Sequence, residues 1–228
     1  CQQVLAIPYK RTPFRAVTCL ARTDIEHLLS SIDRSTALGR RDVALLQFLY
    51  NTGARAQEVV DVRLPAVRFD APAQVRLLGK GRKERLCPLW AETIHLLRAM
   101  LKDRGVPLTE DVPLFVNATG QPLTRFGLGH IVRTRVAAAA VSRPTLAKTP
   151  ITPHTFRHTT AWHLLQSGVE LNVVRSWLGH ASIEATHAYV EIDLQMKRAA
   201  IEACEPPGLN SPPPTWNAPD LLAWLEAL

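Results

Sequence analysis

Four residues in the last third of the chain have the types and spacing needed to bind and attack a phosphate: His154, Arg157, His180 and Tyr189. His154 and Arg157 lie three positions apart, so both project from one face near the N-terminus of a helix that begins at about Pro153. Free backbone N–H groups and the helix dipole favour an anion at that end. The glycines that follow favour tight turns, and we therefore expect the four side chains to converge.

Arg55 is a further candidate for phosphate binding, because it follows Gly53 at the start of an expected helix. An arginine at this position can reach a phosphate, and Glu58, one turn further on, can fix its guanidinium. An ordinary surface Arg–Glu pair is the alternative interpretation of these two residues.

The segment 74–88 alternates apolar and basic residues around a Gly-Lys-Gly tip, a pattern typical of a β-hairpin. Nonspecific phosphate contact is the default role of its five basic residues. Lys80, however, lies between two glycines that allow close approach, so it could enter a site as a proton donor. The G-x-x-x-x-G-K-[ST] spacing is absent, which argues against a P-loop.

These residue types meet the needs of an in-line displacement at a phosphodiester, which requires a nucleophile, positive donors and an acid. The phenol of Tyr189 can form a phosphotyrosine ester, and Arg55 and Arg157 can bind the nonbridging oxygens. Lys80 can protonate the leaving 5′ oxygen. His154 and His180 can hydrogen-bond the phosphate or assist deprotonation of the phenol.

The same pattern argues against a metal-dependent mechanism. No carboxylate cluster accompanies the candidates, so a two-metal nuclease is disfavoured. A zinc site from His154, His158 and His163 is also disfavoured, because the H-E-x-x-H motif is missing and Arg157 lies between the first two. We therefore expect no metal and no cofactor.

Hydrophobic periodicity and capping signals predict a mainly helical scaffold around these residues. Besides the hairpin, a short strand is expected at Leu114–Val116. Helices are expected from Thr23, where Thr-Asp-Ile-Glu has the capping-box pattern, over 37–50, from 54, over 91–102, over 125–140, and in three short pieces within 152–191.

The composition fits a globular domain that meets a polyanion. The 228 residues are 46% hydrophobic and carry a net charge of +7. Residues 191–228 hold six acids and two bases, a net −4, so residues 1–190 carry +11. Four scattered cysteines without a C-x-x-C pair predict reduced thiols in a cytoplasmic protein. No stretch resembles a membrane span or a secretory signal.

Basic residues beyond the catalytic candidates are expected to lie along DNA, although a solvated tail or face is the alternative for each segment. Residues 1–22 hold no acid, and neither does the stretch from Arg125 to Lys148. The candidates for DNA contact are Lys10, Arg11, Arg15, Arg82, Lys83, Arg85, Arg125, Arg133, Arg135, Arg143 and Lys148.

Several motifs, in this order, resemble those of the tyrosine recombinases of the phage-integrase type. The resemblance covers about 23–203 and rests on TGARAQE at 52–58, LLGKGRKERLCPL at 77–89, HTFRH at 154–158, WLGH at 177–180 and THAY at 186–189. It implies that Tyr189 is the nucleophile and that Glu58 supports the first arginine. The implied catalytic set is Arg55, Lys80, His154, Arg157, His180 and Tyr189.

The resemblance also implies a fold and a mechanism. The implied fold is α+β, mainly α-helical, with a small antiparallel β-sheet. A site-specific recombinase of this type cuts DNA through a 3′-phosphotyrosine, without metal or ATP, as a homotetramer on two double-stranded sites. Whether the role is integration, excision, resolution or transposition stays open.

Three segments are expected: a basic linker over 1–22, a catalytic domain over 23–205, and a Pro-rich spacer with an amphipathic helix over 206–228. The family normally carries an upstream core-binding domain, which we expect to be missing here, so this piece should bind DNA weakly. The helix 217–228 either folds back on its own domain or docks on a neighbouring protomer.

Two other function classes stay open at this point. A type IB topoisomerase would use much the same residues as a monomer that relaxes supercoils. A non-catalytic DNA-binding or regulatory protein on this scaffold would keep the basic surface and lose part of the catalytic set, whereas all six positions are filled here.

Overall fold

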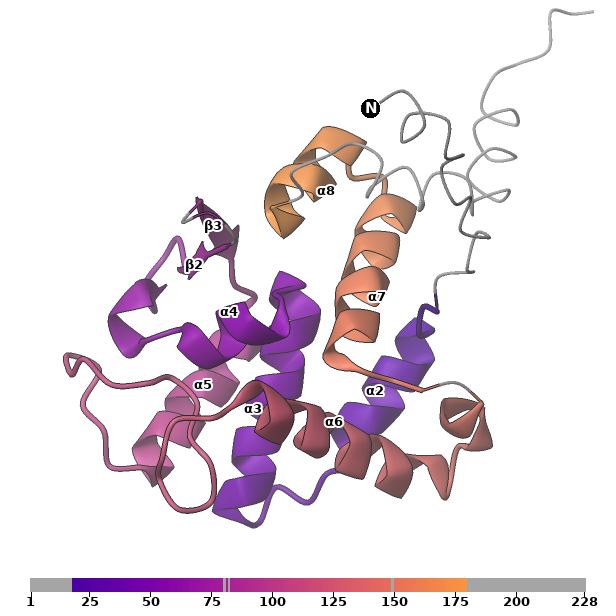
Figure 1. Cartoon of the computed structure of the whole chain (residues 1–228), viewed down its shortest axis with the longest axis horizontal. Helices are drawn as coiled ribbons and strands as arrows, with labels where there is room; N and C mark the ends of the chain where they lie inside the picture. Colours follow the sequence, from indigo (N-terminus) through magenta and orange to yellow (C-terminus); the bar gives the residue numbers. More distant parts are fainter. Residues whose placement is uncertain (1–17, 80, 82, 149, 180–228) are drawn as a thin grey trace, which may run out of the picture. The chain divides into compact units, whose positions relative to one another are not determined.

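The computed structural model describes residues 18–79, 81, 83–148 and 150–179 (Figure 1). All of them belong to the first of two units into which the chain divides, Cys1–Val190. The predicted helix 217–228 lies outside the described part. So do these predicted site residues: Lys10, Arg11, Arg15, Lys80, Arg82, His180 and Tyr189.

The described part is mainly helical with one small antiparallel sheet, as the sequence predicts. Its helices are α2 (Arg22–Ser30), α3 (Ala37–Thr52), α4 (Ala56–Asp61), α5 (Ala91–Asp103), α6 (Arg125–Ala140), α7 (Pro153–Gln166) and α8 (Leu171–Leu178), with 3-10 turns η1 (Leu64–Ala66) and η3 (Pro144–Ala147). Its strands are β1 (Val67–Arg68), β2 (Gln74–Leu78) and β3 (Glu84–Pro88).

Helix α3 forms the centre of the packing, with α5 and α7 against it (Figure 1). Its residues from Asp42 to Leu49 are all buried, which suits a helix with neighbours on several sides. Thr36 caps its N-terminus by accepting a hydrogen bond from Gly39 N at 3.0 Å. Phe48 extends the core towards Phe115, with ring centroids 5.5 Å apart in an edge-to-face arrangement.

Gly53 ends α3 in the left-handed conformation, with φ at 57°. A Cβ atom at this position would lie 2.5 Å from Cδ2 of Leu178, the last residue of α8. A side chain at this position would be strained by the left-handed backbone and would displace the Leu178 side chain, so glycine suits the close approach of α3 and α8.

The predicted hairpin is confirmed. Strands β2 and β3 pair antiparallel, and Leu77 lies opposite Arg85. Val75, Leu77 and Cys87 are buried against the helices, whereas Leu78 is 51% exposed. Strand β1, which pairs with β2, was not predicted because two residues are too few to show an alternating pattern.

Three predicted elements differ from the structure. Helix α2 begins at Arg22 with Ala21 as its N-cap, and Asp24 accepts a hydrogen bond from Ala21 N at 3.3 Å, so the cap lies two residues before the predicted capping box at 23–26. Helix α4 begins at Ala56 rather than at 54. The segment 114–116 forms no strand among the described residues; its backbone makes only isolated contacts, because no regular strand lies beside it.

No helix in the described part of the chain is both long and apolar enough to cross a membrane.

Candidate active site

Helix α7 places two of the predicted residues at the expected helix start. Thr152 caps α7, accepting a hydrogen bond from Thr155 N, and Pro153 occupies the first turn. His154 is exposed at this end, whereas Arg157, one turn further on, is only 2% exposed. The predicted pairing of these two residues on the first turns of one helix is confirmed.

The guanidinium of Arg157 is held by two backbone carbonyls from other segments. Nη1 donates to the carbonyl oxygen of Gly53 at 2.8 Å, and Nη2 donates to that of Leu178 at 2.6 Å. These carbonyls belong to the ends of α3 and α8, which the glycine turn at Gly53 brings together. The plane of the guanidinium is therefore set by the fold.

Arg55 reaches the same region from the start of α4. Its Nη1 donates to Oε1 of Glu58 at 3.0 Å, and its backbone N–H donates to Oε2 at 2.8 Å. Nη2 lies 3.4 Å from the carbonyl oxygen of Gly179. The Arg55 side chain is 40% exposed while that of Glu58 is 3% exposed, so the buried carboxylate anchors an arginine that still faces solvent. The prediction that Glu58 fixes Arg55 is confirmed.

Glu58 is ionised despite its burial. Burial acts to raise the pKa of this carboxyl, but hydrogen bonds and charge from Arg85, and then from Arg55, outweigh it and hold the pKa below its ordinary value. A carboxylate that accepts four hydrogen bonds from two arginines has its lone pairs satisfied.

The His154 ring packs edge-to-face on His158, with centroids 4.2 Å apart. Partial burial, followed by the charges of Arg157 and Arg55, holds the pKa of His154 below its ordinary value. Burial, followed by the charges of His154 and Arg157, lowers the pKa of His158 to about 4. Near pH 7 both rings are neutral, so His154 can accept a proton or donate one hydrogen bond.

A pocket of about 530 Å³ unites these groups, since Arg55, His154 and Arg157 all line it. Arg125 and Phe126 from the start of α6 form another part of its wall. Lys80, His180 and Tyr189 lie outside the described residues, so the structure does not place them.

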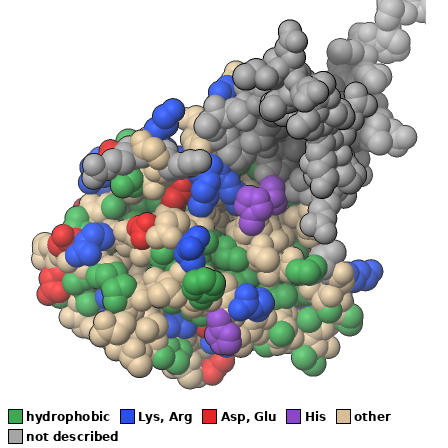
Figure 2. All heavy atoms as spheres, in the orientation of Figure 1, with side chains coloured by type: hydrophobic (Ala, Val, Ile, Leu, Met, Phe, Trp, Pro, Cys, Tyr) green, Lys and Arg blue, Asp and Glu red, His purple; other side chains and the backbone are tan. Residues whose placement is uncertain are grey.

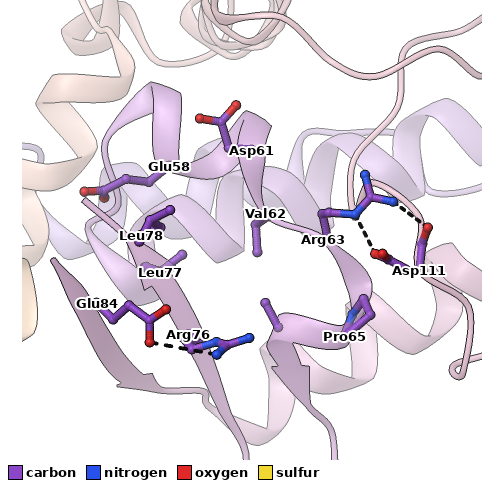
Figure 3. Close-up of a pocket in the computed structure, with 11 residues that line it drawn as sticks. Glu58, Asp61, Val62, Arg63, Pro65, Arg76, Leu77, Leu78, Glu84 and Asp111 are labelled. Atoms are coloured by element: carbon purple, nitrogen blue, oxygen red, sulfur yellow. Dashed lines mark hydrogen bonds and ion pairs between the residues drawn. The ribbon is translucent and has the colours of Figure 1, made fainter. Parts of the chain in front are cut away.

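A second pocket, of about 370 Å³, lies between α4, β2 and the segment that contains Asp111 (Figure 3). Glu58 lies at one end of it, and ion pairs of Arg76 with Glu84 and of Arg63 with Asp111 lie along its wall. None of the three described catalytic candidates lines it. It is therefore not the candidate site.

The described basic residues predicted to contact DNA fall into two groups. Lys83, Arg125, Arg133 and Lys148 are exposed, and their side chains make no hydrogen bond or ion pair with another described residue, so they remain candidates. Figure 2 shows basic side chains spread over the visible face of the molecule, with histidine beside them.

The second group is bonded to acids from distant elements. Arg135 Nε donates to Asp42 Oδ2 at 2.7 Å, and Arg143 pairs with Asp24. The absence of acids between 125 and 148 is therefore offset by acids on α2 and α3, which sequence order hides.

Arg85 departs furthest from its prediction as a surface DNA contact. Its side chain is 9% exposed and is bonded to Glu58, because the pleat of the hairpin turns it towards the helices. This corrects the interpretation of Arg85 as part of an exposed basic finger.

No group of three or more His, Cys, Asp or Glu side chains that could hold a metal occurs in the described part of the chain. His163, the third residue of the zinc alternative, instead lies 2.7 Å from the hydroxyl of Tyr50 through Nδ1.

Comparison with known protein families identifies the family of this chain. The sequence model of the phage integrase family matches residues 19–196. The chain belongs to the phage integrase family. The resemblance drawn from the motifs is thereby confirmed.

Curated relatives in this family are named as recombinases. The y4rC protein of Sinorhizobium fredii, whose name assigns it to the integrases and recombinases, is 39% identical over 210 residues, which cover 90% of this chain and 61% of the relative. Tyrosine recombinase XerD of Listeria innocua is 37% identical over 173 residues, covering 74% and 56%. The chain thus spans less than two thirds of the length of these phage integrase family relatives.

Solved structures agree on the fold. The XerH site-specific recombinase bound to palindromic difH substrate, in a post-cleavage complex, is similar with a TM-score of 0.68 and 28% identity, over 82% of this chain and 53% of that one. The catalytic domain of bacteriophage HP1 integrase matches with a TM-score of 0.55 and 24% identity, over 82% of this chain and 94% of the domain.

Proposed function

We propose that this chain is the catalytic part of a site-specific tyrosine recombinase, which cleaves and rejoins double-stranded DNA through a 3′-phosphotyrosine. The observation that carries the proposal is one pocket lined by Arg55, His154 and Arg157, in a chain of the phage integrase family. Two arginines and a neutral histidine around one pocket can stabilise the negative charge that develops on the phosphate oxygens during cleavage of a phosphodiester.

In the proposed first step the phenolic oxygen of Tyr189 attacks the scissile phosphorus, and the bond to the 5′ oxygen breaks. The phenolic proton passes to a histidine, for which His154 and His180 are the candidates. The leaving 5′ oxygen takes a proton from Lys80 and departs as a hydroxyl. A 5′-hydroxyl from the partner strand then reverses the step, so the bond energy stays in the ester and neither metal nor ATP is needed.

The described residues contribute positioning and charge. The carbonyls of Gly53 and Leu178 fix Arg157, and Glu58 fixes Arg55, before any substrate arrives. Arginines held in place in advance need little reorganisation when negative charge builds on the nonbridging oxygens. Lys83, Arg125, Arg133 and Lys148 are proposed to contact the DNA backbone, with Lys10, Arg11, Arg15 and Arg82 from segments outside the described residues.

The proposed partner is double-stranded DNA, and the proposed assembly is a homotetramer on two sites. The XerH structure is a complex with a DNA substrate, which supports DNA binding here. We place the protein in the cytoplasm, where Cys19 and Cys87, both unpaired thiols, would stay reduced.

The predicted helix 217–228 is proposed to dock on a neighbouring protomer. About eleven residues are too few for a stable helix in water, so its apolar face must be buried. Deleting residues 215–228 is expected to leave cleavage of a single site largely intact and to abolish the complex of two sites, measured by native gel shift. Unfolding of the truncated protein, or normal pairing of two sites, would rule this out.

A nicked DNA substrate tests the activity, because loss of a short fragment after cleavage prevents rejoining and traps the covalent complex. We expect a protein–DNA adduct on denaturing gels with no metal and no ATP added. Supercoil relaxation by the monomer, without joining of two sites, would instead favour a type IB topoisomerase. Binding without any adduct would favour a regulatory DNA-binding protein.

A further inference from the structure

Arg85 is a largely buried cation whose hydrogen bonds connect β3 to two other segments, α4 and α8. On β3 it lies opposite Leu77, which is 1% exposed, so the pleat directs both side chains towards the helices. Nη1 and Nη2 donate to the two carboxylate oxygens of Glu58, at 2.9 and 2.7 Å. Nε donates to the carbonyl oxygen of Trp177 on α8 at 2.9 Å.

Arg85 and Glu58 form a bidentate salt bridge, which restricts the geometry of both side chains. The two side chains are only 9% and 3% exposed, so the pair is shielded from salt and water. The same carboxylate holds the backbone and the guanidinium of Arg55. Arg85 therefore sets the position of Glu58, and Glu58 sets the position of Arg55.

Two glycines from distant parts of the sequence, Gly79 and Gly179, pack against this ion pair. A Cβ atom on Gly79 would lie 3.3 Å from Oε1 of Glu58, and a Cβ on Gly179 would lie 3.1 Å from Cδ of Arg85. Gly79 immediately precedes Lys80, and Gly179 immediately precedes His180. The residues that precede Lys80 and His180 in the chain therefore both contact the Arg85–Glu58 ion pair.

We propose that Arg85 is the positioning residue of the active site. It fixes Arg55 through Glu58, and it fixes the points from which the chain runs to Lys80 and to His180. Arg85 itself does not contact DNA in this proposal, which rests on the proposed recombinase function. Misplacing reacting groups by about 1 Å can cost about 10²-fold in rate, so the predicted defect is in the chemical step.

Arg85→Met in the full chain tests the proposal, with single-turnover adduct formation measured on nicked DNA at increasing DNA concentrations. The expected result is a loss of about 10²-fold in the rate at saturating DNA. The DNA concentration for half-saturation should change little. Arg85→Lys keeps the charge but not the fork, so its rate should lie between those of Arg85→Met and the unaltered protein.

Arg41→Met provides a matched control. Arg41 is also a largely buried arginine, 12% exposed, paired with the buried Asp42 and bonded to the carbonyl of Val116. It lies eleven residues, or roughly 17 Å along α3, before the end of that helix at Thr52. We expect it to lower the unfolding temperature without changing the cleavage rate per folded molecule.

Three results would overturn the proposal. The first is Arg85→Met cleaving at the unaltered rate per folded molecule, and the second is an equal loss in Arg41→Met at an equal folded fraction. If Arg85→Met does not fold, Glu58→Gln is tested in its place. The third contradicting result is then a Glu58→Gln variant that cleaves at the unaltered rate at saturating DNA. Absence of an adduct from the unaltered protein would instead reject the proposed function, so the two failures are distinguishable.

Discussion

Tyr189→Phe is expected to bind DNA with unaltered affinity and to give no covalent adduct. The substitution removes only the phenolic oxygen, which is the atom that a phosphotyrosine link requires. DNA binding is measured by native gel shift, and the adduct is measured on a denaturing gel with end-labelled nicked DNA. The expected effect is complete loss, the largest that any single substitution in this chain should produce.

Tyr50→Phe is the matched control, since the chain has only three tyrosines, Tyr9, Tyr50 and Tyr189. Burial raises the pKa of Tyr50, and its hydroxyl lies 2.7 Å from His163, so it is a poor nucleophile held by another partner. Tyr50→Phe should still form the adduct. An adduct that persists in Tyr189→Phe and disappears in Tyr50→Phe would reverse the assignment.

Lys80→Ala is expected to slow cleavage of ordinary DNA by about 10²–10⁴-fold, the usual scale of general acid catalysis. The leaving 5′ oxygen is a strong base as an alkoxide and needs a proton as the bond breaks. A 5′-bridging phosphorothiolate leaves as a thiolate and needs no acid, so Lys80→Ala should cleave that substrate at nearly the unaltered rate. Both rates are measured in single-turnover reactions.

The comparison of the two substrates separates acid catalysis from charge. An equal loss on ordinary and phosphorothiolate DNA would mean that Lys80 acts only electrostatically. Lys83, exposed on the same hairpin, is the alternative acid. If Lys83→Ala alone shows the substrate-dependent loss, the assignment moves to that residue.

Local signals in the sequence predicted much of the fold. The helix starts near 125 and 153 are predicted within a residue or two, and in the structure the hydroxyls of Thr124 and Thr152 cap them by accepting a backbone N–H. The hairpin over 74–88 and the Arg55–Glu58 pair follow from spacing in the same way. Each of these interactions joins residues within about one turn or one loop.

What the sequence did not predict depends on contacts between distant segments. Arg85 lies two positions from the exposed Lys83 on the same basic hairpin, and only its contacts with Glu58 and Trp177 show that it is buried. Arg135 and Arg143 belong to an acid-free stretch but meet acids from α3 and α2. The strand expected at 114–116 failed for a related reason, since a strand needs a regular partner as well as apolar residues.

The site of covalent attachment tests the proposed tyrosine recombinase chemistry most directly. The adduct is digested with nuclease and trypsin, and the peptide that keeps a nucleotide remnant is identified by mass spectrometry. We expect the remnant on Tyr189, in the tryptic peptide 176–197, which contains no other tyrosine. A remnant on peptide 42–55 or 1–10, which hold Tyr50 and Tyr9, would contradict it, as would the absence of any remnant from protein that has bound nicked DNA.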